Sequence, residues 1–269
     1  MAADDGLLDV RDLRISYSRR NGAYRAVQGV SLSLHRGGTL CLVGESGSGK
    51  TSIAMSIPRL LPETAAVEGS VLFDRRDLLS CPRSELYEVR RRSISVVFQD
   101  AIGSLVPGTL IGVQLRRALV HRLGGSQSTN LDRTAEELLA AVGLVDPARV
   151  TSSQPHELSA GMCQRVMIAL ALSARPSLLI ADEPLSSLDA ISQVRVLDLL
   201  FELRLRYGYA ILFVTHDLRV ARRFEQLGVL REGRLVDYGT TTQVLSAPSS
   251  EYTRELLSAG RSLSGSQAH

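Results

Sequence analysis

Eight consecutive residues in the first quarter of the chain limit the possible folds more than any other segment. They are Gly44-Glu45-Ser46-Gly47-Ser48-Gly49-Lys50-Thr51, which match the pattern G-x-x-x-x-G-K-[ST] of the phosphate-binding P-loop. The apolar run 40–43 before them is typical of a buried strand, and residues 52–57 can continue as a helix. A P-loop needs this order of strand, glycine-rich loop and helix, because glycines let the backbone approach phosphate and the helix start supplies N–H donors.

The residues of the P-loop have separate expected roles. Lys50 would reach the β- and γ-phosphates of a nucleoside triphosphate, and the hydroxyl of Thr51 would bind Mg²⁺. We expect nine residues to contact the nucleotide: Gly44, Glu45, Ser46, Gly47, Ser48, Gly49, Lys50, Thr51 and Ser52. Alone, this motif leaves kinases, GTPases, motor proteins and transport ATPases open.

A second informative segment is an apolar run that ends in two acids. Residues 178–181 are apolar, and Asp182 and Glu183 follow them directly. Buried carboxylates are costly unless they are paired or lie near a metal. In P-loop proteins an acid at this place sits beside Mg²⁺, so we expect Asp182 near the ion. Glu183 is then placed to orient or deprotonate the attacking water; a simple turn after the strand is the structural alternative.

The hydropathy pattern along the chain predicts an α/β protein. Residues 7–34 alternate between apolar and polar, as antiparallel strands with one wet face do. Residues 100–165 follow mostly helical spacing. Residues 178–214 then read strand, helix, strand, which indicates a parallel sheet with right-handed crossovers.

Composition excludes several classes of protein. The 269 residues carry a formal net charge of only +3, so nucleic acid is not an expected partner. The three cysteines are far apart and form no C-x-x-C, which argues against a disulfide framework or a zinc site. The acidic N-terminus has no apolar segment typical of a signal peptide, and no run of about 18 apolar residues exists. Any membrane role is therefore expected to come through a partner.

Several further motifs, in order around the P-loop, resemble those of ABC transporter ATPases. Residues 158–162, Leu-Ser-Ala-Gly-Met, resemble the family signature LSGGQ, in which Ser159 and Gly161 would bind ATP held by a second ATPase subunit. The other motifs are an aromatic residue for the adenine ring, a Q-loop glutamine, a D-loop aspartate and a switch histidine: Tyr17, Gln99, Asp189 and His216. The resemblance spans residues 7–260.

This resemblance implies a fold, a chemistry and a domain plan. The fold is a P-loop NTPase (RecA-like) core with an N-terminal antiparallel β-subdomain and an inserted helical subdomain. One domain is expected over residues 1–260, with the core and β-subdomain in 7–99 and 166–245 and the helical subdomain in 100–165. Residues 246–269 are expected to form a C-terminal tail with a disordered end. ATP and Mg²⁺ are the implied ligands, with Thr51, Gln99 and Asp182 at the metal and Glu183 and His216 in catalysis.

Each of these motifs alone also has an ordinary structural explanation. His216 could be a structural histidine, Gln99 a polar strand end and Tyr17 a packing residue, and Tyr24 is a rival for the adenine platform. The functional interpretation rests on their shared order around the P-loop.

A narrower resemblance points to the ATPases of oligopeptide, dipeptide and nickel importers. It lies in residues 154–169, in 78–79 with 94–100, and in 238–241. The chain departs from that group at Ala160, Ala101, Val106 and Cys163, and it lacks a longer cysteine-bearing extension, so no Fe–S cluster is predicted. An ABC exporter ATPase, a non-transport ABC ATPase and a regulatory nucleotide binder remain alternatives.

The same resemblance implies partners at the cytoplasmic face of a cell membrane. They are transmembrane permease subunits, a second ABC ATPase subunit and, through the permease, an extracytoplasmic solute-binding protein. Met162 after the signature glycine favours a sister ATPase subunit over a second copy of this chain.

Overall fold

The computed structural model describes residues 6–19, 22–123 and 130–265, and its contacts divide the chain into two compact units. The first unit consists of residues 1–86 and 211–269, and the second of residues 87–210. Among the described residues, no helix is long and apolar enough to cross a membrane.

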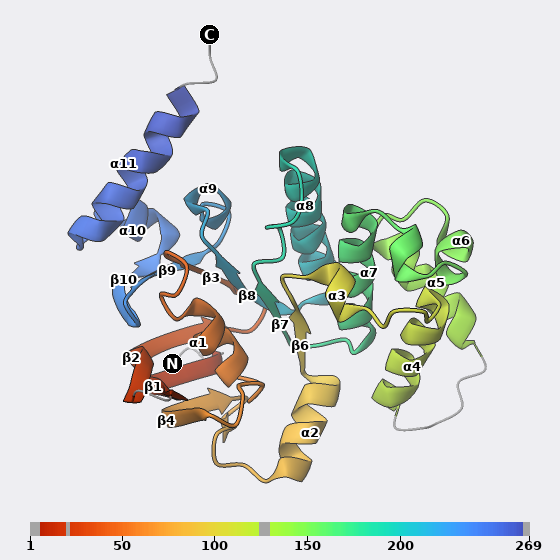
Figure 1. Ribbon diagram of the computed structural model, residues 1–269, viewed down its shortest axis with the longest axis horizontal. Helices are drawn as coiled ribbons and strands as arrows, with labels where there is room; N and C mark the ends of the chain where they lie inside the picture. The colour runs from red at the N-terminus through yellow and green to blue at the C-terminus, as the bar shows by residue number, and fades with distance from the viewer. Residues whose placement is uncertain (1–5, 20–21, 124–129, 266–269) are drawn as a thin grey trace, which may run out of the picture. The chain divides into compact units, whose positions relative to one another are not determined.

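An antiparallel sheet of order β2-β1-β4-β5 forms the N-terminal part of the first unit (Figure 1). Its strands are β1 (Gly6–Arg19), β2 (Gly22–His35), β4 (Ala65–Phe73) and β5 (Arg76–Asp77). In β2, the buried side chains of Val30, Leu32 and Leu34 alternate with exposed ones. The antiparallel strands predicted from the alternating hydropathy of residues 7–34 are confirmed.

The first unit also holds core strands in the order β10-β9-β3-β8. They are β3 (Thr39–Val43), β8 (Ala210–Thr215), β9 (Gln226–Arg231) and β10 (Arg234–Thr240), and β3 runs parallel to both β8 and β9. Every residue of β3 and β8 is buried, which explains their unbroken apolar sequence. The helices of this unit are α1 (Lys50–Ser56), α9 (Leu218–Ala221), α10 (Thr241–Ser246) and α11 (Glu251–Gly265).

The second unit combines two parallel strands with most of the helices (Figure 1). The strands are β6 (Ile94–Val97) and β7 (Leu178–Asp182), and α2 (Arg83–Arg92) crosses from the first unit into the second. The helices are α3 (Ala101–Ser104), α4 (Ile111–Leu123), α5 (Leu131–Ala141), α6 (Pro147–Thr151), a 3₁₀ turn (Pro155–Glu157), α7 (Ala160–Ser173) and α8 (Ala190–Tyr207). Helices α4, α5 and α7 pack together, and α7 crosses the subdomain boundary that we expected after residue 165.

The C-terminal segment, expected as a tail from residue 246, contains the helix α11. The residues just before α11 are bound to the side chain of Asp237, in the middle of β10. This carboxylate accepts hydrogen bonds from the backbone N–H groups of Ser249 (2.8 Å) and Ser250 (3.1 Å). Burial alone would raise the pKa of Asp237, but these bonds and those from the hydroxyls of Thr253 and Ser250 lower it. The last four residues of the predicted disordered end, 266–269, lie outside the described residues.

Candidate functional site

The P-loop follows β3, and the side chain of its Lys50 folds back onto the start of the loop. The Nζ atom of Lys50 donates hydrogen bonds to the carbonyl oxygens of Gly44 (2.7 Å) and Glu45 (2.8 Å). The side chain of Lys50 is almost completely buried. A buried ammonium group is stable only with close polar partners, so the backbone of the loop holds this cation at the place where phosphate would bind.

Two glycines of the P-loop lie where no side chain fits. Gly49 has φ +104°, and a Cβ there would lie 2.5 Å from the carbonyl oxygen of Ala26. At Gly44, a Cβ would lie 2.2 Å from the carbonyl oxygen of Leu230. The buried hydroxyl of Ser48 has no hydrogen-bond partner among the described residues. A backbone cradle with an unsatisfied hydroxyl fits a polyphosphate, which offers many acceptor oxygens.

Both candidate adenine-platform tyrosines lie beside the P-loop. Tyr17 on β1 and Tyr24 on β2 are directly opposite each other, so their side chains share one face of the sheet. The hydroxyl of Tyr17 lies 2.9 Å from that of Ser52, and the hydroxyl of Tyr24 donates to the carbonyl of Gly47 at 3.4 Å. The fold thus brings both candidates to the loop and leaves the choice between them open.

A third tyrosine, which the sequence analysis missed, contacts the same loop. The hydroxyl of Tyr252 on α11 accepts a hydrogen bond from the backbone N–H of Glu45 at 3.2 Å. Tyr252 is buried, which raises its pKa, and the guanidinium of Arg231 lies 4.8 Å from its ring centre. No local pattern marks Tyr252, because it lies 207 residues from Glu45 in a segment without a motif.

His216 leaves the sheet at the same edge as the P-loop. Val43 and Thr215, the last residues of β3 and β8, are partners in a parallel pair of strands. Gly44 and His216, which follow them, therefore leave neighbouring strands at the same edge of the sheet. The side chain of His216 is exposed. The next residue, Asp217, caps α9; burial would raise its pKa, but hydrogen bonds from the side chain and backbone of Arg219 lower it. Asp217 is therefore fixed as a carboxylate.

In the second unit, the predicted acids and the Q-loop glutamine lie at the carboxyl ends of two neighbouring parallel strands. Val97 and Ala181 are partners in the parallel pair of β6 and β7, so Gln99 and Asp182 follow neighbouring strand ends. Asp182 is buried, whereas Gln99 is exposed. Glu183 has φ +46°, a left-handed backbone conformation that costs a residue with a side chain about 1–3 kcal/mol. Six other described residues with side chains also have a positive φ, so the role of Glu183 rests on its position directly after Asp182.

The signature residues of the second unit line a pocket of about 350 Å³. Ser159 caps α7 by accepting a hydrogen bond from the N–H of Met162 at 3.3 Å. A Cβ on Gly161 would meet no atom within 4 Å, so this face is open. Asp189 caps α8 through Ser192, another residue of the pocket, and hydrogen bonds from its hydroxyl and N–H lower the pKa of Asp189. Ser159 and Gly161 thus face an open pocket, while the carboxylate of Asp189 is engaged in a cap.

Among the residues that the structure describes, no group of three or more His, Cys, Asp or Glu side chains could hold an ion. An ion at Asp182 would therefore depend on further ligands, such as phosphate oxygens of a nucleotide.

Comparison with known proteins places the chain among ATP-binding transport proteins. The family model for ABC transporters matches residues 27–186. The oligopeptide transport ATP-binding protein OppD of Haemophilus influenzae is 39% identical over 264 residues, which cover 98% of this chain and 81% of OppD. The peptidoglycan transport ATP-binding protein YejF of Agrobacterium fabrum is 43% identical over 256 residues. That match covers 94% of this chain but 47% of YejF, so the chain spans about half of that relative.

Solved structures give the same fold. The ATP-binding cassette MJ0796, determined as a dimer in a post-hydrolysis state with ADP and phosphate, superposes with a TM-score of 0.78 at 28% identity, covering 87% of this chain and 98% of that one. The structure of cbiO1 from Clostridium perfringens has a TM-score of 0.75 at 24% identity, covers 97% of this chain and all of that one, and supports the fold alone. The predicted fold class, with an antiparallel N-terminal sheet and a parallel core, is confirmed. The chain belongs to the family of ABC transporter ATP-binding proteins and is similar in nearly its full length to the oligopeptide and dipeptide transport branch.

Proposed function

We propose that this chain hydrolyses ATP as the energising subunit of an ABC importer for peptides. The observation that carries the proposal is the cradle around buried Lys50, in a chain similar from end to end to OppD. The names of the relatives favour oligopeptides and dipeptides over nickel or other metal chelates as the solute.

The chemistry follows from residues already described. Phosphoryl transfer depends on positioning and on neutralising charge more than on covalent help. Lys50 and the N–H groups of the P-loop would hold the β- and γ-phosphates, with Tyr17 or Tyr24 against the adenine. Glu183 would accept the proton of the attacking water, and His216 would contact the γ-phosphate and hold that water in place.

The oxygen ligands available fit Mg²⁺. The hydroxyl of Thr51, the carboxylate of Asp182 and the amide oxygen of Gln99 are hard donors of the kind that this ion prefers. When bound, the ion would neutralise developing negative charge on the phosphates.

A second ATPase subunit would complete the site. The signature of each subunit would cover the ATP on the P-loop of the other, with Ser159 and Gly161 toward the γ-phosphate and Asp189 at the subunit interface. The open face at Gly161 supports this role, as does the dimer of MJ0796. Permease subunits would hold the pair at the cytoplasmic face of the membrane, where an extracytoplasmic binding protein would deliver the solute through them.

Replacing the proposed base tests the hydrolytic function. In the assembled complex, Glu183→Gln should lower hydrolysis of the ATP held by this chain by about 10²–10⁴-fold while ATP binding is kept, because a positioned base is lost. Glu202→Gln, which removes the same charge from an exposed position on α8, is the control and should hydrolyse ATP normally. Near-normal turnover by Glu183→Gln would refute the assignment.

A further inference from the structure

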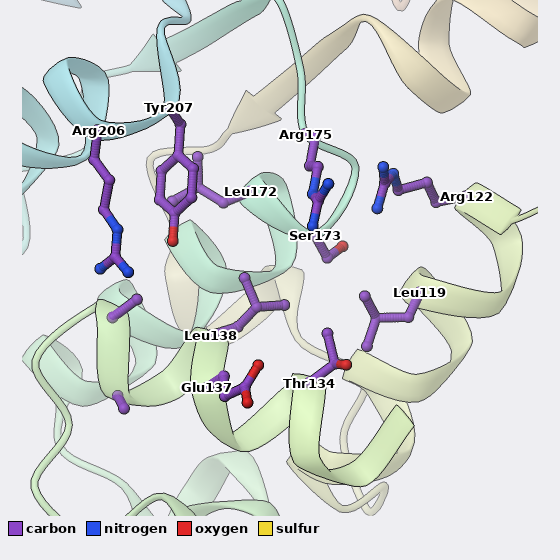
Figure 2. Close-up of a pocket in the computed structure, with 12 residues that line it drawn as sticks. Leu119, Arg122, Thr134, Glu137, Leu138, Leu172, Ser173, Arg175, Arg206 and Tyr207 are labelled. Atoms are coloured by element: carbon purple, nitrogen blue, oxygen red, sulfur yellow. The ribbon is translucent and has the colours of Figure 1, made fainter. Parts of the chain in front are cut away.

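The second unit has a pocket of about 450 Å³ that the ATPase function does not use (Figure 2). It lies among α4, α5, the last turn of α7 and the end of α8. Helix α7 runs from the signature at Ser159 to Ser173 in this pocket, a length of about 20 Å at 1.5 Å per residue. The pocket is therefore separate from the signature residues.

The pocket has an excess of positive charge. Its lining includes Arg122, Arg175 and Arg206, and its one acid, Glu137, already forms an ion pair with Arg133 at 3.0 Å. Figure 2 shows the guanidinium groups of Arg122 and Arg175 in the same part of the pocket, near Ser173. Burial and the positive charges of Arg175 and Arg92 lower the pKa of Arg122. An anion between two like charges would relieve this repulsion.

Stabilisation of helix C-termini by positive charge explains two of the three arginines but not the third. Arg122 and Arg206 lie in the last turns of α4 and α8, where a cation interacts favourably with the helix dipole. Arg175 lies beyond the end of α7 in a left-handed backbone conformation, with φ +48°. Its position adds a third cation to a cavity that is large enough for a small molecule.

The rest of the lining is apolar and aromatic. Leu119 and Leu138 line the pocket below Arg122 and Arg175, and Leu172 lies beside the ring of Tyr207 (Figure 2). The guanidinium of Arg206 lies 5.4 Å from the centre of that ring. The pocket thus offers an anion-binding end beside a surface for an uncharged body.

We propose that this pocket binds a small phosphorylated molecule with an apolar or aromatic body. The phosphate would lie between Arg122 and Arg175, since guanidinium groups match the geometry of phosphate oxygens. The body would lie against Tyr207 and the three leucines.

Methyl NMR of the full chain tests this site with phenyl phosphate as the probe. Saturable shifts of the methyl signals of Leu119, Leu138 and Leu172 are expected, and these signals report the pocket and not the P-loop. Inorganic phosphate and phenol, which each carry half of the probe, should bind at least tenfold more weakly.

Variants locate the phosphate. Arg122→Gln and Arg175→Asn should each weaken binding by about ten- to a hundredfold, because each removes a charged hydrogen-bond donor; asparagine tolerates the backbone of residue 175. Arg117→Gln removes the same charge from the exposed side of α4 and should change affinity less than twofold. Unchanged methyl spectra without ligand establish that the variants are folded. Absence of leucine shifts, equal binding of inorganic phosphate, or equal weakening by Arg117→Gln would overturn the proposal.

Discussion

At the scale of single residues, the proposed ATP hydrolysis rests on one cation, Lys50, and one acid, Glu183. Lys50 is the only lysine in the chain, and all other cationic side chains except histidines are arginines. An ammonium group fits this buried loop because it is compact and can donate in three directions, whereas a guanidinium is planar and larger. Glu183 keeps a left-handed backbone directly after buried Asp182, a strain that the surrounding fold must offset.

Removing the lysine should weaken ATP binding itself. We expect Lys50→Ala to raise the dissociation constant at least tenfold, since a charge-assisted contact to phosphate contributes about 1.5–3 kcal/mol. Calorimetric titration with ATP measures this. Arg76→Ala, which removes a positive charge from exposed β5 in the same unit, is the control. Equal affinities of Lys50→Ala and wild type would contradict the role of Lys50.

At the scale of helices and strands, patterns near a motif were predictable and distant contacts were not. The strand before the P-loop and the apolar strand that ends at Asp182 follow from local hydropathy. Which strands pair with them does not, because the partners of β3 lie about 170 residues further along the chain. Residues 246–269 were expected to form a tail, and the helix α11 lies within them. In the structure, Ser249 and Ser250 instead bind the carboxylate of Asp237, and this arrangement brings Tyr252 to Glu45. No local pattern encodes such a tertiary contact.

The contact from α11 should position the P-loop. Tyr252→Phe removes the hydroxyl that accepts from Glu45 and keeps the ring, so we expect ATP affinity to fall about two- to tenfold, as for one lost hydrogen bond. Tyr238→Phe is the matched control, because the hydroxyl of Tyr238 donates a hydrogen bond to the carbonyl of Ser33 and not to the P-loop. Fluorescent-nucleotide binding compares the two. A similar loss of ATP affinity in both variants, or no loss in Tyr252→Phe, would rule out a specific role of the Tyr252 hydroxyl in positioning the P-loop.

At the scale of the whole molecule, the proposed assembly has two unequal ATP sites. Ala160 replaces the usual first glycine of the signature at the start of α7, where the backbone must approach the γ-phosphate of the partner's ATP. A defect there would affect the ATP on the sister subunit, whereas the ATP on Lys50 would meet the sister's intact signature.

Knocking out the base of each subunit in turn tests this asymmetry. In the assembled complex, Glu183→Gln in this chain should remove most of the ATP hydrolysis, and the corresponding change in the sister should remove less. Steady-state phosphate release measures both. Equal losses, or a purified complex with two copies of this chain and no sister, would defeat the idea.

The most direct test of the proposed function is peptide uptake by the complex in sealed vesicles. ATP is enclosed on the side of this subunit, and a labelled oligopeptide with its binding protein is supplied on the other side. We predict accumulation of peptide that requires ATP and is abolished by Glu183→Gln, but not by Glu202→Gln. Accumulation that persists with Glu183→Gln, or ATP-dependent movement of peptide in the opposite direction, would contradict the account.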